Sequence, residues 1–160
     1  MTPTSTYAHR LRIYWEDTDA GGVVFYANYL KFFERARTEW LRSLGFGQQQ
    51  LRDETGAIFI VSDTRVRYLR PARLDDELTV TVEVQHAGQA SLSIAQVAWR
   101  GEERLAEGEI RIGCVDAGSF RPRRIPEALI RVMADHVAAQ GTRARGLPLN
   151  SEHDKTSRKD

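Results

Sequence analysis

Two carboxylates stand close together in residues 14–29, and their spacing fits chemistry on a carbonyl group. Asp17 and Asp19 are followed at once by Gly21 and Gly22, and then by the start of an amphipathic pattern. The start of a helix presents backbone N–H groups without partners and the positive end of the helix dipole. A carboxylate beside free amide donors has what is needed to activate a nucleophile and stabilise an oxyanion. The stretch therefore predicts a site for attack on a carbonyl.

The elements on either side of this stretch would position it. Apolar residues alternate with polar ones before it, which predicts a half-buried strand over 8–16 with Trp15 on its apolar face. After it, apolar residues recur every three or four positions, which predicts a long amphipathic helix over 26–44 that ends at Gly45.

The rest of the chain reads mainly as strands. Residues 46–56 are polar and rich in glutamine, and they are expected to form a loop. Four runs with the period of a strand follow, at 57–70, 77–85, 91–100 and 104–115. In the first of these runs, Ile58, Ile60, Ser62, Thr64, Val66 and Tyr68 are expected on one face, with Arg65 and Arg67 on the other.

A basic linker at 116–126 leads to a second helix that begins near Pro126 and carries Leu129, Met133 and Val137 on its apolar face. Short turns between consecutive strands predict an antiparallel sheet, and one long helix against such a sheet is an α+β domain. We expect a single domain over 1–141 and a polar, disordered tail over 142–160.

The composition is that of a globular protein and excludes several other classes. The chain has 160 residues, 41% of them hydrophobic and 28% charged, with a net charge of +1, so charge gives no pull toward nucleic acid. The single cysteine, Cys114, cannot form a disulfide within the chain. No run reaches the roughly 18 apolar residues of a membrane span. The N-terminus has no apolar signal core, so a cytoplasmic location is expected.

The run from Asp17 to Tyr29, the following Phe32-Phe33-Glu34-Arg35-Ala36-Arg37 and the later stretch from Tyr68 to Asp76 resemble hotdog-fold acyl-CoA thioesterases. The branch that they resemble contains 4-hydroxybenzoyl-CoA thioesterase and the Tol–Pal-associated acyl-CoA thioesterases. The resemblance covers roughly residues 8–130 and implies a five-stranded antiparallel sheet wrapped around one long central helix, with a C-terminal helix. It implies no metal and no cofactor.

The resemblance also implies roles for individual residues. Asp19 occupies the position of the family's catalytic carboxylate, a nucleophile or a general base for water. Tyr26 occupies the position whose backbone N–H polarises the thioester carbonyl; the Tol–Pal group typically has histidine there, and the 4-hydroxybenzoyl branch has tyrosine. Gly22, Val24 and Phe25 of the same run would contact the substrate. The family builds its site across a dimer, and its dimers commonly pair into tetramers.

Each of these residues also has a purely structural interpretation. Asp19 could have no role beyond forming an Asx turn, and we expect Asp17 to have a structural role. A calcium loop is excluded because Asn28 stands where a bidentate glutamate is needed. The histidines are scattered, at His9, His86, His136 and His153, and form no metal pattern.

Further polar residues could meet the substrate or the membrane. Ser62 and Thr64 could orient substrate or water, although such hydroxyls usually bond the backbone. Arg65 and Arg67, with Arg70 and Arg73, could meet coenzyme A phosphates or form a solvated face. A weak contact with anionic lipid at the inner membrane face could come from three arginines, Arg121, Arg123 and Arg124.

The expected function is hydrolysis of acyl-CoA, or of acyl groups on acyl carrier protein, by a homo-oligomer. Two alternatives remain open at this point. One is a hotdog dehydratase, whose chemistry usually needs a histidine paired with an acid. The other is a non-catalytic protein of the cell envelope machinery that binds acyl thioesters or acts as a scaffold.

Overall fold

The structure, a computed structural model, describes residues 6–144 and the side chains through residue 135. Strand β1 (Tyr7–Arg12) is followed by a short 3₁₀ turn, η1 (Trp15–Asp17), and by the long helix α1 (Asn28–Ser43). A short helix, α2 (Gln48–Thr55), precedes four strands: β2 (Ala57–Tyr68), β3 (Glu77–Ala87), β4 (Ser91–Arg100) and β5 (Glu103–Asp116). Helix α3 (Glu127–Ala144) comes last.

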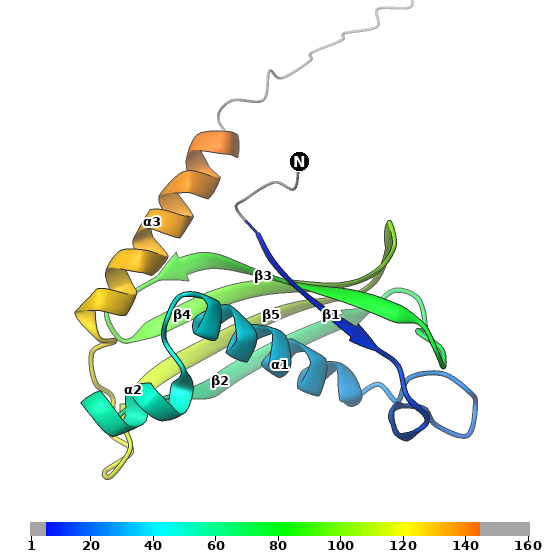
Figure 1. The fold of residues 1–160 in the computed structure, drawn as a ribbon, viewed down its shortest axis with the longest axis horizontal. Coiled ribbons are helices and arrows are strands. Elements are labelled where there is room, and N and C mark those ends of the chain that lie inside the picture. The colour runs from blue at the N-terminus through cyan, green and yellow to red at the C-terminus, as the bar shows by residue number, and fades with distance from the viewer. Residues whose placement is uncertain (1–5, 145–160) are drawn as a thin grey trace, which may run out of the picture.

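The five strands form one antiparallel sheet in the order β1-β3-β4-β5-β2, and α1 crosses one of its faces (Figure 1). This is the α+β hotdog arrangement predicted from the sequence. In β3 and β4 every second side chain is buried toward α1, as the alternating pattern predicts. Helix α3 lies at one end of the sheet, where Leu129 and Met133 join the core.

Helix α1 is held close to the sheet by a glycine and a buried amide. Gly108 on β5 lies directly beneath Phe33, so that a Cβ at this position would stand 2.8 Å from the ring. Gln96 on β4 is only 1% exposed and donates hydrogen bonds to the carbonyl oxygens of Phe33 (3.0 Å) and Thr81 (3.3 Å). These contacts hold α1 in one position on the sheet, and so they position the start of the helix relative to the sheet.

Two sequence-based expectations about elements were wrong. The strand expected over 8–16 ends at Arg12, and Trp15 is 81% exposed in η1 because the chain turns there instead of continuing along the sheet. The loop expected over 46–56 contains α2, between Gly47 and a left-handed Gly56. A single buried residue, Leu51, anchors this short helix, so the sequence shows no apolar period.

The expected face of β2 was also wrong. A β-bulge between Val61 and Asp63 leaves Ser62 without a partner on β5. A bulge shifts the alternation by one residue, so side chains before it and after it change faces. Phe59 packs on the core before the bulge, and Val66 packs on it after the bulge. The side chains that face the core therefore belong to odd-numbered residues before the bulge and to even-numbered residues after it.

The long helix expected over 26–44 is confirmed by α1, which begins two residues later. Helix α3 extends through Ala144, three residues beyond the predicted domain boundary. The side chain of Val137 and the remainder of the predicted tail, 145–160, lie outside what the structure describes.

Candidate active site

The acidic turn is a tight hairpin tip that presents Asp19 on its surface. An isolated bridge joins Thr18 to Val24, and the Asp19 amide donates to the Val23 carbonyl oxygen at 2.9 Å. The Gly22 amide returns to the Asp19 carbonyl oxygen at 3.0 Å, with φ of 78° at Gly22. Because this φ lies in the left-handed region, the turn needs glycine there.

Asp19 combines a structural contact with a free oxygen. Its Oδ1 accepts a hydrogen bond from the Gly21 amide at 2.8 Å, which is the Asx turn considered from the sequence. Among the described residues, no partner contacts Oδ2, and the residue is exposed. One oxygen thus orients the carboxylate while the other can take up a proton or attack a carbonyl carbon.

Asp17 joins the turn to the helix start. Its side chain accepts a hydrogen bond from the Tyr14 amide at 2.8 Å and closes η1. Its carbonyl oxygen accepts two more, from the Phe25 amide (2.9 Å) and from Nδ2 of Asn28 (2.8 Å). Both the side chain and the main chain of Asp17 are therefore engaged in structure, as expected. The role of Asn28, the first residue of α1, was not foreseen from the sequence.

The segment just before α1 offers backbone donors beside this turn. Ala27 precedes the helix in an αR conformation and no side chain caps the helix. Within the described part of the chain, neither the Tyr26 amide nor the Ala27 amide donates a hydrogen bond. Free amides at a helix start attract negative charge, and the helix dipole adds to the effect. This is the donor arrangement that an oxyanion requires.

Three tyrosines form a wall next to the helix start. The Tyr68 hydroxyl donates to the Tyr26 carbonyl oxygen at 2.9 Å, and the Tyr29 hydroxyl accepts from the Ala72 amide at 3.3 Å. The Tyr68 ring meets Tyr26 and Tyr29 edge to face, with centroids 6.2 Å and 5.4 Å apart. Burial raises the pKa of Tyr29 and of Tyr68, so both hydroxyls stay protonated near neutral pH.

A cavity of about 280 Å³ opens beside this wall, and an ion pair supports one of its lining residues, Pro71. The lining residues are mostly apolar or aromatic: Val24, Tyr26, Tyr29, Tyr68, Leu69, Arg70 and Pro71. Arg100 donates to the Pro71 carbonyl oxygen (3.3 Å) and to Asp76 (2.7 Å). Burial acts to raise the pKa of Asp76, but hydrogen bonds from Arg100 and the Arg73 amide outweigh it and hold the pKa below its usual value.

The structure brings together only part of the predicted site. Gly22, Val24, Phe25 and Tyr26 lie with Asp19 at the turn and the helix start. Ser62, Thr64, Arg65 and Arg67 lie along β2, an edge strand of the sheet, and none of them lines the cavity.

The hydroxyl of Ser62 donates to the Arg111 carbonyl oxygen at 3.3 Å, so it serves the backbone in this chain. The roles proposed for these β2 residues toward substrate stay predictions. Tyr68 was missed as a site residue, although it opens the later stretch on which the family resemblance rests.

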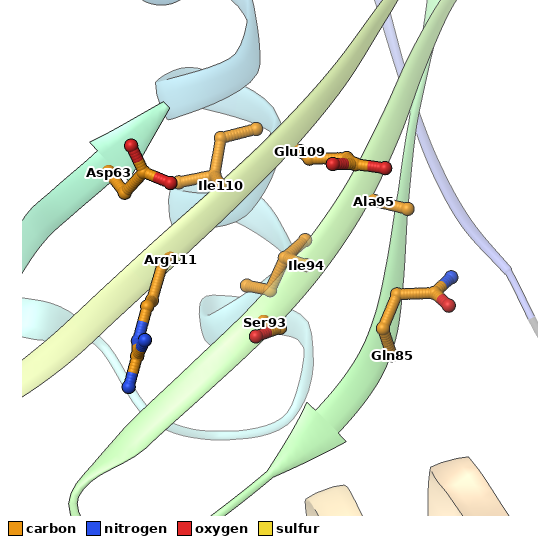
Figure 2. A pocket seen from close by; sticks show the side chains of 8 residues that line it. All are labelled: Asp63, Gln85, Ser93, Ile94, Ala95, Glu109, Ile110 and Arg111. Carbon is orange, nitrogen blue, oxygen red and sulfur yellow. The ribbon is translucent and has the colours of Figure 1, made fainter. Parts of the chain in front are cut away.

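A second hollow, of about 430 Å³, lies on the face of the sheet opposite to α1 (Figure 2). Asp63, Glu109 and Arg111 gather there with Gln85 and Ser93, while α1 lies behind the strands. Since it shares no residue with the acidic turn, we do not assign it to the site. Across the described residues, no group of three or more His, Cys, Asp or Glu side chains could hold a metal ion.

Comparison with known proteins decides the family. The family model described as the thioesterase superfamily matches residues 21–107, which run from the acidic turn into β5. The chain belongs to the thioesterase superfamily. Within this superfamily it is 42% identical to the acyl-CoA thioesterase YbgC of Haemophilus influenzae, over 76% of this chain and 89% of that protein. It is also 42% identical to the acyl-CoA thioester hydrolase YbgC of Escherichia coli O157:H7, over 79% of this chain and 95% of that protein.

Solved structures of the superfamily agree with the fold. A probable thioesterase from Bartonella henselae is 32% identical and superposes with a TM-score of 0.72, over 76% of this chain and 99% of that one. Of the helices in the described part of the thioesterase domain, none is both long and apolar enough to cross a membrane.

Proposed function

We propose that the chain hydrolyses acyl-CoA thioesters to a free acid and a thiol, with Asp19 as the reacting carboxylate. The observation that carries this is the position of Asp19 on a turn that Asp17 ties to the helix start. Within residues 6–144, Oδ2 of Asp19 accepts no hydrogen bond and the Tyr26 and Ala27 amides at that helix start donate none. Relatives 42% identical to this chain, over most of their length, are acyl-CoA thioesterases by name, which supports the substrate class.

In the proposed reaction the thioester carbonyl oxygen points at the Tyr26 and Ala27 amides. As the carbonyl carbon becomes tetrahedral, these donors and the helix dipole stabilise the oxyanion. Asp19 either removes a proton from the attacking water or attacks the carbonyl carbon itself and forms a mixed anhydride that water then cleaves. In both routes the C–S bond breaks, and the departing thiolate takes up a proton.

The aromatic cavity beside Tyr26 offers a place for the acyl group. At about 280 Å³, with tyrosine rings on its wall, it would accept a ring or a short chain. A carrier protein would present the same thioester, so acyl carrier protein stays a candidate donor. Arg65 and Arg67 remain our candidates for the phosphates of coenzyme A.

We also propose that the active protein is a homo-oligomer, a dimer or a dimer of dimers. β2 is twelve residues long, forms an edge of the sheet and is exposed through its middle. Such an edge attracts another strand unless something covers it. Pairing of two copies there would bring Thr64, Arg65 and Arg67 toward another subunit. Light scattering tests this, and a stable monomer with full activity would contradict it.

The location of the protein stays a prediction, with the cytoplasm as the expected compartment. For contact with the inner membrane face, the side chains of two of the three candidate arginines are already engaged within the chain. Arg123 donates to the Thr55 carbonyl oxygen (2.6 Å) and Arg124 to Gln89 (3.2 Å), which weakens the support for a lipid contact.

The decisive experiment is thiol release from a panel of acyl-CoAs by the wild type, Asp19→Asn and Asp17→Asn. In Asp19→Asn the new amide oxygen can still accept from the Gly21 amide, so the turn should persist while the reacting carboxylate is lost. We expect kcat to fall roughly 10²-fold or more. In Asp17→Asn the amide oxygen can still accept from Tyr14, and kcat should change only a few-fold.

Two outcomes would redirect the proposal. If Asp17→Asn is inactive and Asp19→Asn is active, the wrong carboxylate has been assigned. If the wild type binds acyl-CoA but releases no thiol from any substrate, the non-catalytic alternative replaces hydrolysis.

A further inference from the structure

Residues 71–76, in the connection between β2 and β3, lie against both the acidic turn and the start of α1. The Val24 amide in the turn donates to the Ala72 carbonyl oxygen at 2.8 Å. The Ala72 amide donates to the Tyr29 hydroxyl in the first turn of α1 at 3.3 Å, and Ala72 is completely buried. This segment therefore contacts the chain on both sides of the amides proposed to hold the oxyanion.

A second contact ties the same segment to Asp19. An isolated antiparallel bridge joins Arg73 to Val23, and the Val23 carbonyl oxygen accepts the hydrogen bond from the Asp19 amide at 2.9 Å. A movement of the segment would therefore displace the reacting carboxylate and the oxyanion donors together. Since a displacement of about 1 Å in a reacting group can cost roughly 10²-fold in rate, the segment has to be held firmly for the proposed reaction.

Arg100, the last residue of β4, holds the segment at both of its ends. Its Nη1 donates to the Pro71 carbonyl oxygen at 3.3 Å and to Oδ2 of Asp76 at 2.7 Å. The same Asp76 oxygen accepts from the Arg73 amide at 2.8 Å, which closes the segment on itself. Nη2 of Arg100 donates to Glu103 at 3.1 Å across the turn to β5, and this contact fixes the plane of the guanidinium.

The exposure of this ion pair argues against a role in stability alone. The side chains of Arg100 and Asp76 are 31% and 23% exposed. Ion pairs that solvent reaches usually add little to the free energy of unfolding. The planar guanidinium is better suited to orientation, because one side chain here binds a carbonyl oxygen and two carboxylates at fixed angles.

We propose that Arg100 and Asp76 position the site for hydrolysis: they hold residues 71–76 in place and, through them, Asp19 and the oxyanion donors. Because the pair acts through this segment, the two are positioning residues and not catalytic ones. Their effect on the rate rests on the proposed hydrolysis, whereas their hold on the acidic turn does not.

The first test is steady-state hydrolysis of acyl-CoA by full-length variants, at temperatures where circular dichroism shows each one folded. Arg100→Met keeps most of the length of the side chain but removes its donors, and kcat should fall roughly ten-fold or more. Asp76→Ala should show the same loss. The double variant should lose no more than either single variant, because the two residues act as a unit.

A rescue and a control accompany these variants. In Asp76→Asn the amide oxygen can still accept from Arg100 and from the Arg73 amide, so kcat should stay within about three-fold of the wild type. Arg104→Met is the matched control, since Arg104 pairs with Glu107 (2.8 Å) on the same sheet instead of with residues 71–76. It should keep kcat within about two-fold.

The second test needs no activity. Amide hydrogen exchange, followed by NMR, reports how often the hydrogen bond from Val24 to Ala72 opens. In Arg100→Met, exchange at Val24 should be roughly ten-fold faster or more. Exchange at Ile125, whose amide donates to the Gln89 carbonyl oxygen (2.8 Å) beyond the other end of β4, should not change. A general loss of stability would instead speed up both amides.

The two tests separate this proposal from the proposed function. Unchanged exchange at Val24 in a folded Arg100→Met would overturn the hold on the turn, whatever the wild type hydrolyses. Normal kcat in both Arg100→Met and Asp76→Ala would overturn the role in catalysis. If the wild type releases no thiol, hydrolysis fails, while the exchange at Val24 still decides the hold on the turn. The same exchange measurement on Asp76→Ala decides it if Arg100→Met does not fold.

Discussion

Replacing Gly108 with alanine should separate α1 from the sheet and so test how the site is positioned. The new Cβ would lie 2.8 Å from Cε2 and 3.2 Å from Cδ2 of Phe33, and 3.2 Å from Cδ1 of Ile110. Contacts of this kind cost about 1–3 kcal/mol in a packed core. For a chain of this size, about 2 kcal/mol corresponds to a fall in Tm of roughly 4–8 °C.

The loss of activity should exceed what the loss of stability explains. Phe33 lies on α1, and the amides proposed to hold the oxyanion stand at the start of the same helix. A displacement of about 1 Å in a reacting group can cost roughly 10²-fold in rate. We therefore expect kcat for acyl-CoA hydrolysis to fall at temperatures where Gly108→Ala is still fully folded, as monitored by circular dichroism.

The control and the rescue lie within the same contact. A Cβ at Gly113, also on β5, meets only the Ile60 carbonyl oxygen at 3.9 Å, so Gly113→Ala should change Tm by little. Adding Phe33→Leu to Gly108→Ala should restore part of the stability, with a coupling of about 1 kcal/mol between the two changes. If Gly108→Ala is neutral, or if the smaller side chain at position 33 gives no relief, the close approach of helix and sheet has been misread.

Three shorter predictions concern the site and its supports. Tyr68→Phe removes the hydrogen bond to the Tyr26 carbonyl, worth about 1 kcal/mol, so steady-state kinetics should show kcat lower by roughly 5-fold with KM nearly unchanged. Arg100 holds the pKa of Asp76 in the folded protein below its usual value. The stabilisation that the Asp76 carboxylate supplies is therefore complete above about pH 4 and is lost as the pH falls through the pKa of the folded state. The free energy of unfolding in urea should depend less on pH in this range for Asp76→Asn than for the wild type. Gly22→Ala meets no neighbouring atom but must keep φ near 78°, so thermal unfolding should show a loss of about 1–2 kcal/mol that comes from the backbone alone.

Periodicity in the sequence was sufficient for the helix and the sheet but not for irregular features. The apolar stripe of α1 runs from Tyr29 to Leu41, so its period is plain. Helix α2 buries only Leu51, and a single anchor has no period. The bulge at Ser62 inserts one residue into an otherwise regular strand, and nothing in the local composition marks it. Both errors arise where tertiary packing, rather than local pattern, decides the backbone.

The acidic turn was visible in the sequence because its chemistry is local, whereas its surroundings are not. Asp19 contacts residues two to four positions away. The hydrogen bond from Tyr68 to Tyr26 spans 42 positions, and that from Arg37 to Gln96 spans 59. Pairs so far apart are brought together by the register of the sheet, and one sequence without the fold offers no sign of them.

The two carboxylates of the turn illustrate how a short motif can divide structure from chemistry. Asp17 uses its side chain to close η1 and its carbonyl to bind both Phe25 and Asn28, so the turn stays attached to the helix start without help from Asp19. Asp19 contributes one oxygen to the turn and keeps the other toward solvent. Because the scaffold does not depend on that second oxygen, a carboxylate there can change its protonation or its bonding during a reaction while the amides of Tyr26 and Ala27 remain in place.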